Sequence, residues 1–207
     1  DLLERKKNKV NAEIEIVVIR LPSISNFSDL DPLYSEPSVK LKWIEPNEYI
    51  GEPDAVIIPG SKQTIKDLNI LNISGLSDQI KNYAKNGGIV FGICGGLQMI
   101  GRSIEDPSSV EHSKKSNSDL KVSGLDLIPI NTKFEIKKSL EKITKQSLWP
   151  IKIEVSGFEL HHGRSQPVDA TSKDMNSIFE DSRLGWVIEK TPTACIAGTY
   201  LHGIFDN

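Results

Sequence analysis

The chain has 207 residues, of which 38% are hydrophobic and 26% charged, and this composition fits one globular domain with a substantial core. A net charge of −3 gives no reason to expect a nucleic acid or an anionic membrane as a partner. The apolar runs are far too short to span a bilayer, and the charged N-terminus lacks the apolar region of a signal peptide. Two cysteines, Cys94 and Cys195, do not make a disulfide framework, which favours a reducing, cytoplasmic location.

The first half of the chain alternates predicted strands with predicted helices. Apolar or alternating runs predict strands, and 3.6-residue periodicity predicts helices. The strands are expected at residues 14–19, 39–44, 55–58 and from 89, and the helices at 64–71, at 76–85 and directly after Cys94. A loop with at most a short helix is expected at 21–37. This alternation predicts an α/β fold with a parallel sheet covered on both faces, whose chemistry gathers at the carboxyl ends of the strands.

The second half is predicted to be mainly β. Residues 103–123 are rich in Ser, Lys, Asp and Glu and predict a mobile surface loop. Strands are expected at 125–130, 152–155, 186–189 and 194–199, with an extended or hairpin segment at 140–147. The fold should therefore carry an extra β segment in its second half.

Cys94 stands in the run Gly92-Ile93-Cys94-Gly95-Gly96, between a predicted strand and a predicted helix. Glycines at such a junction allow a sharp turn and close approach of a substrate, which is the arrangement of a nucleophile elbow. The N-terminus of a helix also favours the reactive thiolate form. The alternatives are a phosphate-binding turn or a tight strand–helix junction, although the run lacks the Lys-Ser/Thr ending of a P-loop. Cys195, inside an apolar strand, is interpreted as a buried small side chain.

A cysteine enzyme also needs a base, and the chain has four histidines. His112 lies in the polar loop and is expected to be solvated. His161 and His162 follow the strand-like run 157–160, and His202 follows a predicted strand and precedes Gly203. A strand-end histidine taken alone is often just a packed or solvated residue, and the signal at His161 is weaker than that at His202.

Hydrogen-bond donors for an oxyanion are expected from backbone N–H groups. The candidates are Gly95 and the turn formed by Gly60 and Ser61, which ends a predicted strand and opens a helix. Gln98 lies one turn into the helix after Cys94, where a surface position is the alternative to a contact with a ligand.

Five segments, taken together, resemble the glutamine amidotransferase domains of the cobyric acid synthase family. They occur in the same order as in that family and span nearly the whole chain. The segments are residues 21–33, the Pro-Gly-Ser-Lys turn at 58–68, the Cys94 run at 92–101, the Gly-Phe-Glu-Leu-His run at 157–164 and the Gly-Thr-Tyr-Leu-His run at 198–206.

The resemblance implies a flavodoxin-like glutaminase fold and a set of roles. Cys94 would attack the side-chain amide of glutamine to form a γ-glutamyl thioester and release ammonia, with His202 as general base and acid. The Gly60–Ser61 turn and Gly95 would stabilise the oxyanion, and Gln98 would contact the substrate.

The resemblance also implies a larger enzyme. Residues 1–13 would be a linker from a missing N-terminal synthetase domain, and 14–207 the glutamine amidotransferase domain. The ammonia would serve ATP-dependent amidation of adenosylcobyrinic acid a,c-diamide in cobalamin biosynthesis. ATP and Mg²⁺ would be bound by the synthetase domain, and no cofactor or metal is expected in this chain.

One departure concerns the acid that orients the histidine. Triad-type glutamine amidotransferases place Glu two residues after this histidine, but Ile204 occupies that position here. The family branch works with a Cys–His dyad or recruits an acid from elsewhere. Glu159 is one candidate, with a structural or substrate-facing role beside His161 as the alternative.

Three alternatives to the cobyric acid synthase assignment remain open at this point. The chain could be the glutaminase of cobyrinate a,c-diamide synthase, the partner of a peptidoglycan-modifying ligase, or a catalytically silent docking domain. Residues 25–27 and 198–203 favour cobyric acid synthase, and the intact Cys94 and His202 argue against a silent domain.

Overall fold

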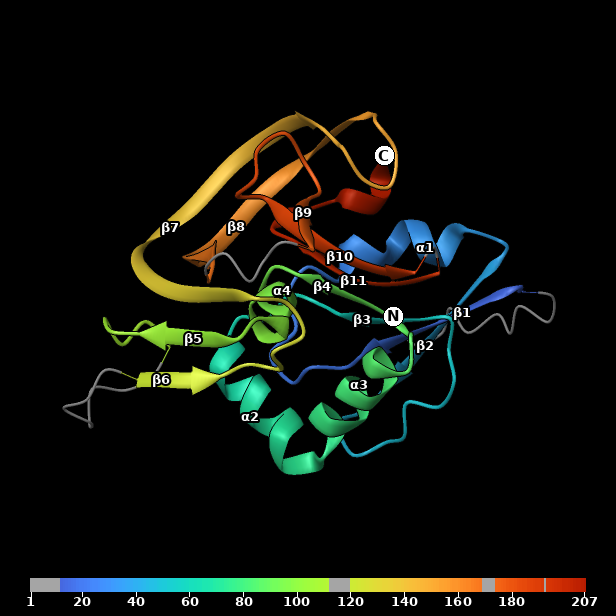
Figure 1. Cartoon of the computed structure of the whole chain (residues 1–207), viewed down its shortest axis with the longest axis horizontal. Helices are drawn as coiled ribbons and strands as arrows, with labels where there is room; N and C mark the ends of the chain where they lie inside the picture. Colours follow the sequence, from blue (N-terminus) through green and yellow to red (C-terminus); the bar gives the residue numbers. More distant parts are fainter. Residues whose placement is uncertain (1–11, 112–119, 169–173, 192) are drawn as a thin grey trace.

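The computed structural model describes residues 12–111, 120–168, 174–191 and 193–207, which form two β-sheets with helices packed around the larger one (Figure 1). The elements in chain order are β1 (Ile14–Ile19), η1 (Phe27–Leu30), α1 (Asp31–Ser35), β2 (Val39–Ile44), β3 (Ala55–Ile58), α2 (Thr64–Ser74), α3 (Leu76–Lys85), β4 (Ile89–Ile93), α4 (Gly95–Ile100), β5 (Ser103–Asp106), β6 (Leu120–Ser123), β7 (Ile130–Gln146), β8 (Glu154–Pro167), β9 (Met175–Ser177), β10 (Gly185–Thr191), β11 (Ala194–Thr199), β12 (Leu201–His202) and η3 (Ile204–Asp206).

The larger sheet has the strand order β2-β1-β3-β4-β11-β10-β9. Its first five strands are parallel, and β10 and β9 extend it in antiparallel pairing. This order matches the flavodoxin-like arrangement, in which the chain doubles back at the first strand. The prediction of a mostly parallel α/β sheet is confirmed.

Both faces of this sheet are buried, as the apolar run in β1 predicts. Val17 packs with Leu68 of α2 and Ile80 of α3 in one cluster, whereas Val18 packs with Leu30 of η1 in another. The helices α2 and α3 therefore cover one face, and α1 lies over the other (Figure 1). Alternation of side chains along β1 places consecutive valines in opposite clusters.

The smaller sheet has the order β12-β8-β7-β5-β6 and is the predicted extra β segment. Its long antiparallel pair, β7 and β8, arches over the larger sheet (Figure 1). The expected extended segment at 140–147 is confirmed, since its residues up to Gln146 belong to β7. The strand β12 joins the edge of β8 and thereby brings the end of the chain beside it.

The predicted mobile loop at 103–123 is wrong at both ends, which form the antiparallel pair β5 and β6. The polar composition of this segment gave no sign of a strand. A single apolar side chain, Ile104, at 0% exposure, is enough to anchor β5 in the core. The prediction for His112 and for the linker up to residue 11 falls outside the described residues.

The predicted strand at 125–130 is wrong except at Ile130, where β7 begins. The N–H groups of Leu125 and Leu127 instead donate to the carbonyl oxygens of Met99 and Ile100 at the end of α4. Leu125 is buried and Leu127 is partly buried because this segment closes the end of a helix.

No helix among the described residues is long and apolar enough to cross a membrane.

Glycine at position 96 is required by the packing of α4 on β3. A Cβ atom there would lie 1.9 Å from the Ile58 carbonyl oxygen. We expect Gly96→Ala to lower the free energy of unfolding by about 1–3 kcal/mol, the usual cost of overpacking. The control Asn69→Ala, at an exposed position in α2, should stay within about 0.5 kcal/mol of wild type. Urea unfolding measures both, and equal midpoints for the two variants would contradict this packing account.

Candidate active site

Cys94 lies in the turn between β4 and α4, and its backbone has φ 52° and ψ −105°. Positive φ is costly for a residue with a side chain, on the order of 1–3 kcal/mol, and is concentrated at functional sites. The turn is held by the Cys94 N–H, which donates to the Thr199 carbonyl at 2.7 Å, and by the Gln98 N–H, which donates to the Cys94 carbonyl at 3.1 Å. The predicted strand-to-helix elbow is therefore confirmed.

The thiol of Cys94 is enclosed, with the residue only 4% exposed. Its Sγ lies 3.5 Å from the carbonyl oxygen of Leu160 in β8 and is also hydrogen-bonded to the His202 side chain. The sulfur thus lies against β8, which helps to cover it near Leu160.

His202, in β12, is fully buried and contacted on several sides. Its Nδ1 lies 2.7 Å from Oδ2 of Asp29, and the other oxygen of that carboxylate accepts the Gly203 N–H at 3.0 Å. The amide nitrogen of Asn26 lies 3.0 Å from the same Nδ1. The ring stacks on Phe158 with 5.0 Å between centroids. These contacts fix the plane of the imidazole.

Two opposing effects determine the protonation of His202. Burial lowers its pKa, but hydrogen bonds and charge from Asp29 and Cys94 outweigh burial and raise the pKa to about 9. The ring is therefore protonated in the folded protein at neutral pH.

The turn of Gly60 and Ser61 lies beside these two groups. A Cβ on Gly60 would be 3.4 Å from Cε1 of His202 and 3.8 Å from Cβ of Cys94. A Cβ on Gly95 would be 2.8 Å from the backbone nitrogen of Ser61. Gly95 and the turn of Gly60 and Ser61, the predicted sources of oxyanion donors, thus lie together next to Cys94.

A buried carboxylate holds this turn in place. Oδ2 of Asp67 accepts the Ser61 hydroxyl at 2.7 Å and the Ser23 N–H at 3.1 Å. The Ser25 N–H donates to the Gly60 carbonyl at 2.9 Å. The loop after β1 and the turn after β3 are therefore tied together, and the Ser61 side chain is used for this structural contact.

Gln98 is buried in α4, at 2% exposure, and bridges several elements. Its Nε2 donates to the His162 carbonyl at 3.0 Å and to the Tyr200 hydroxyl at 3.2 Å. Its Oε1 accepts the Thr64 hydroxyl at 3.4 Å. These contacts dock α4 against β8, so a contact between Gln98 and substrate stays a prediction.

The hypothesis that Glu159 is the acid that orients His202 is wrong. Its Oε1 lies 3.1 Å from Nε2 of His161, whose Nδ1 lies 2.9 Å from the Gly163 carbonyl oxygen. Phe158 is the register partner of His202, and adjacent side chains of a strand point to opposite faces. Glu159 and His161 therefore face away from His202, and the His161 ring stacks on Tyr200 at 3.8 Å between centroids.

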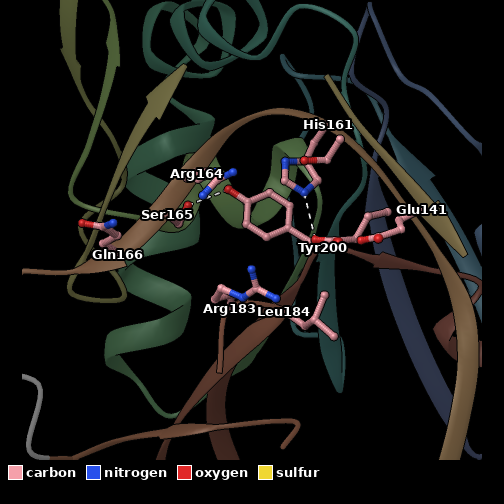
Figure 2. Close-up of a pocket in the computed structure, with 10 residues that line it drawn as sticks. Glu141, His161, Arg164, Ser165, Gln166, Arg183, Leu184 and Tyr200 are labelled. Carbon is pink, nitrogen blue, oxygen red and sulfur yellow. Dashed lines mark hydrogen bonds and ion pairs between the residues drawn. The ribbon is translucent and has the colours of Figure 1, made fainter. Parts of the chain in front are cut away.

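A cavity of about 200 Å³ opens on this second face of β8. Tyr200 lies in its middle, with its hydroxyl 2.6 Å from that of Ser165 and with Arg183 and Leu184 beneath the ring (Figure 2). Its lining residues carry both signs of charge; they are Ser139, Glu141, Glu159, His161, Arg164, Ser165, Gln166, Arg183, Leu184 and Tyr200.

Comparison with known families identifies the domain. The CobB/CobQ-like glutamine amidotransferase domain matches residues 15–207 of the chain. The chain belongs to this family. The family assignment agrees with a nucleophile elbow, a strand-end histidine and a glycine turn brought together at one point.

Curated relatives are about half identical to this glutamine amidotransferase domain over the region that they match. The cobyric acid synthase of Prochlorococcus marinus (strain NATL1A) is 54% identical over 208 residues, and that of a second strain of the same species is 55% identical over 207 residues. That of Synechococcus sp. (strain CC9605) is 49% identical. Each match covers 100% of this chain but only 40–42% of the relative, so the chain spans less than half the length of these proteins.

Solved structures with low sequence identity share the fold. The structure of PurLQS from Thermotoga maritima superposes with a TM-score of 0.65 at 13% identity, covering 92% of this chain and 87% of that one. A glutamine amidotransferase structure gives 0.63 at 12% identity, covering 90% and 89%. These matches bear on the fold alone.

Sequence reasoning missed Asp29 and Asn26 as neighbours of His202. Both lie in the segment that was expected to be a loop, and they are 173 and 176 residues from the histidine. One signal was available, because the apolar Ile204 implied that an acid would have to come from elsewhere in the chain.

The raised pKa of His202 makes stability depend on pH. In the unfolded chain this group titrates near its ordinary value of 6.5, and in the folded chain near 9. Its stabilising contribution is therefore complete below about pH 6.5 and is lost as the pH rises through about 9. We expect the decline of unfolding free energy over this window to be shallower in Asp29→Asn than in the exposed control Asp31→Asn. Urea midpoints from about pH 6 to 9.5 measure this, and parallel curves for the two variants would contradict it.

Proposed function

We propose that this domain hydrolyses glutamine through a thioester at Cys94 and delivers the ammonia to the amidation reaction of a cobyric acid synthase. The observation that carries the proposal is the hydrogen-bonded Cys94–His202 pair at a strained elbow, with the Gly60 turn against it. The 54–55% identity to curated cobyric acid synthases favours this enzyme over cobyrinate a,c-diamide synthase or a peptidoglycan-modifying ligase.

The first half-reaction releases ammonia. His202 holds the proton of the Cys94–His202 pair, and the thiolate electron pair forms a bond to the amide carbon of glutamine while the carbonyl π pair moves to oxygen. Because Nδ1 faces Asp29, Nε2 is the ring atom that exchanges the proton. His202 then protonates the amide nitrogen, the C–N bond breaks, and ammonia leaves a γ-glutamyl thioester.

The second half-reaction restores the enzyme. Water attacks the thioester carbon and gives one proton to His202, and the C–S bond breaks with its electron pair going to sulfur. His202 keeps that proton beside the thiolate, as at the start of the cycle, and glutamate leaves. The net reaction is glutamine plus water giving glutamate plus ammonia.

Backbone N–H groups would stabilise the oxyanion in both steps. Gly95 is the first residue of α4, so its N–H has no acceptor within the helix. The nearby Ser61 N–H lies in the turn that Asp67 holds. Donors fixed in this way cost little reorganisation when negative charge develops.

The cavity beside Tyr200 supports binding of the amino-acid end of glutamine. Glu159 and His161, two of its lining residues, are the neighbours of Leu160, whose carbonyl contacts the Cys94 thiol. The carboxylates of Glu141 and Glu159 would receive the α-ammonium, and the nearby guanidinium groups would receive the α-carboxylate.

The remainder of a longer protein would use the ammonia. The curated relatives are more than twice the length of this chain, which leaves room for an ATP-dependent synthetase portion. That portion would bind ATP and Mg²⁺ and amidate carboxylates of adenosylcobyrinic acid a,c-diamide. A cytoplasmic location is part of the proposal, in keeping with the two free cysteines.

The test of the proposal compares the two cysteines. Cys94→Ala should abolish glutamate release from glutamine, because the attacking atom is lost, whereas Cys195→Ala should retain at least about half of the wild-type rate, since Cys195 lies in β11 outside the site. Coupled glutamate detection measures the rates, with labelling by a glutamine-analogue chloroketone as a second readout. Equal rates in wild type and Cys94→Ala would overturn the proposal.

A further inference from the structure

We propose that Asp29, from the segment after β1, is the positioning residue that orients His202 for proton transfer to and from Cys94. This inference rests on the proposed function and adds to it the residue that supplies the carboxylate beside His202. The position two residues after His202 is Ile204, which packs partly buried against the core and offers no such group.

The carboxylate of Asp29 contacts His202 at two points. Oδ2 lies 2.7 Å from the ring Nδ1, and Oδ1 accepts the Gly203 N–H at 3.0 Å. Asp29 is 5% exposed, so water competes little for either oxygen. One acid therefore fixes both the ring and the backbone that carries it.

This geometry selects the chemical state of the histidine. A carboxylate at Nδ1 accepts the Nδ1–H and holds the neutral ring in the Nδ1–H tautomer, which leaves Nε2 free to take a proton. When the ring becomes protonated, the same carboxylate stabilises the positive charge in a site that excludes water. Both effects reach Cys94 through His202, because the two carboxylate oxygens of Asp29 are directed at the ring and at the Gly203 N–H.

The other acids near this part of the chain do not have this geometry. Glu159 is paired with His161 on the opposite face of β8. Asp31 is exposed, in the first turn of α1. Asn26 adds a second contact from the same segment, because its amide nitrogen lies 3.0 Å from Nδ1 and 3.2 Å from Nε2. The acid therefore comes from a segment 173 residues before the histidine.

A purely structural role for Asp29 predicts different results from a positioning role. A structural acid would lower stability on removal and leave the pH profile of Cys94 reactivity unchanged. A positioning acid would change the titration of His202, the reactivity of Cys94 and kcat, with little effect on KM.

The experiment compares Asp29→Asn with the matched control Asp31→Asn. We expect kcat for glutamine hydrolysis to fall by about 10²–10⁴-fold in Asp29→Asn with KM nearly unchanged. The pKa of the His202 ring, followed by NMR and assigned with His202→Gln, should fall from about 9 toward 6.5. Alkylation of Cys94 by iodoacetamide at about pH 7, located by peptide mass spectrometry, should slow at least about tenfold, the change that one pKa unit produces.

A measurement without substitution covers the case in which Asp29→Asn fails to fold. In wild type at about pH 10, where the ring is neutral, ¹⁵N shifts of His202 should report the Nδ1–H tautomer, and the Nε2–H tautomer would overturn the proposal. Identical His202 titration and Cys94 alkylation in the two Asn variants would also overturn it. These readouts need no turnover. If the wild-type protein releases no glutamate but Asp29→Asn still slows the alkylation of Cys94, only the proposed function is contradicted.

Discussion

The close approach of α4 to the end of β3 determines the position of every group around Cys94. Gly96 packs directly on the Ile58 carbonyl, so the chain must leave β4 and enter α4 without the space that an ordinary turn would need. The positive φ of Cys94 is the consequence. The same packing brings Gly95 against the turn of Ser61, and the bond from Cys94 to Thr199 places the thiol near the start of β12.

Burial then gives the polar contacts their strength. His202 and Asp29 are almost fully removed from water, so a hydrogen bond between them orients the ring and keeps it protonated. The cost is a closed site, because β8 covers the sulfur through the Leu160 carbonyl and is held to α4 through Gln98. The strand β8 therefore packs over the sulfur on one side, while Asp29 holds His202 from the segment after β1.

Local patterns in the sequence predicted the strands and turns whose formation depends only on residues that are near one another in the chain. The bounds of β1, β3 and β11 followed from short apolar runs, and the elbow at Cys94 followed from its glycines. The pairing of β5 with β6 was missed because one buried isoleucine anchors an otherwise polar strand. The contact of Asp29 with His202 depends on tertiary structure, and the error at Glu159 arose because one sequence does not reveal which face of β8 meets β12.

In the proposed reaction, the γ-glutamyl group of glutamine is attached covalently to Cys94 during turnover. The most direct measurement is peptide mass spectrometry of the wild-type domain, quenched in acid during the hydrolysis of isotopically labelled glutamine. We expect a labelled γ-glutamyl group on the peptide that contains Cys94, and hydroxylamine should remove this group as it removes other thioesters. Sustained glutamate release with no label on that peptide, or with the label on Cys195, would contradict it.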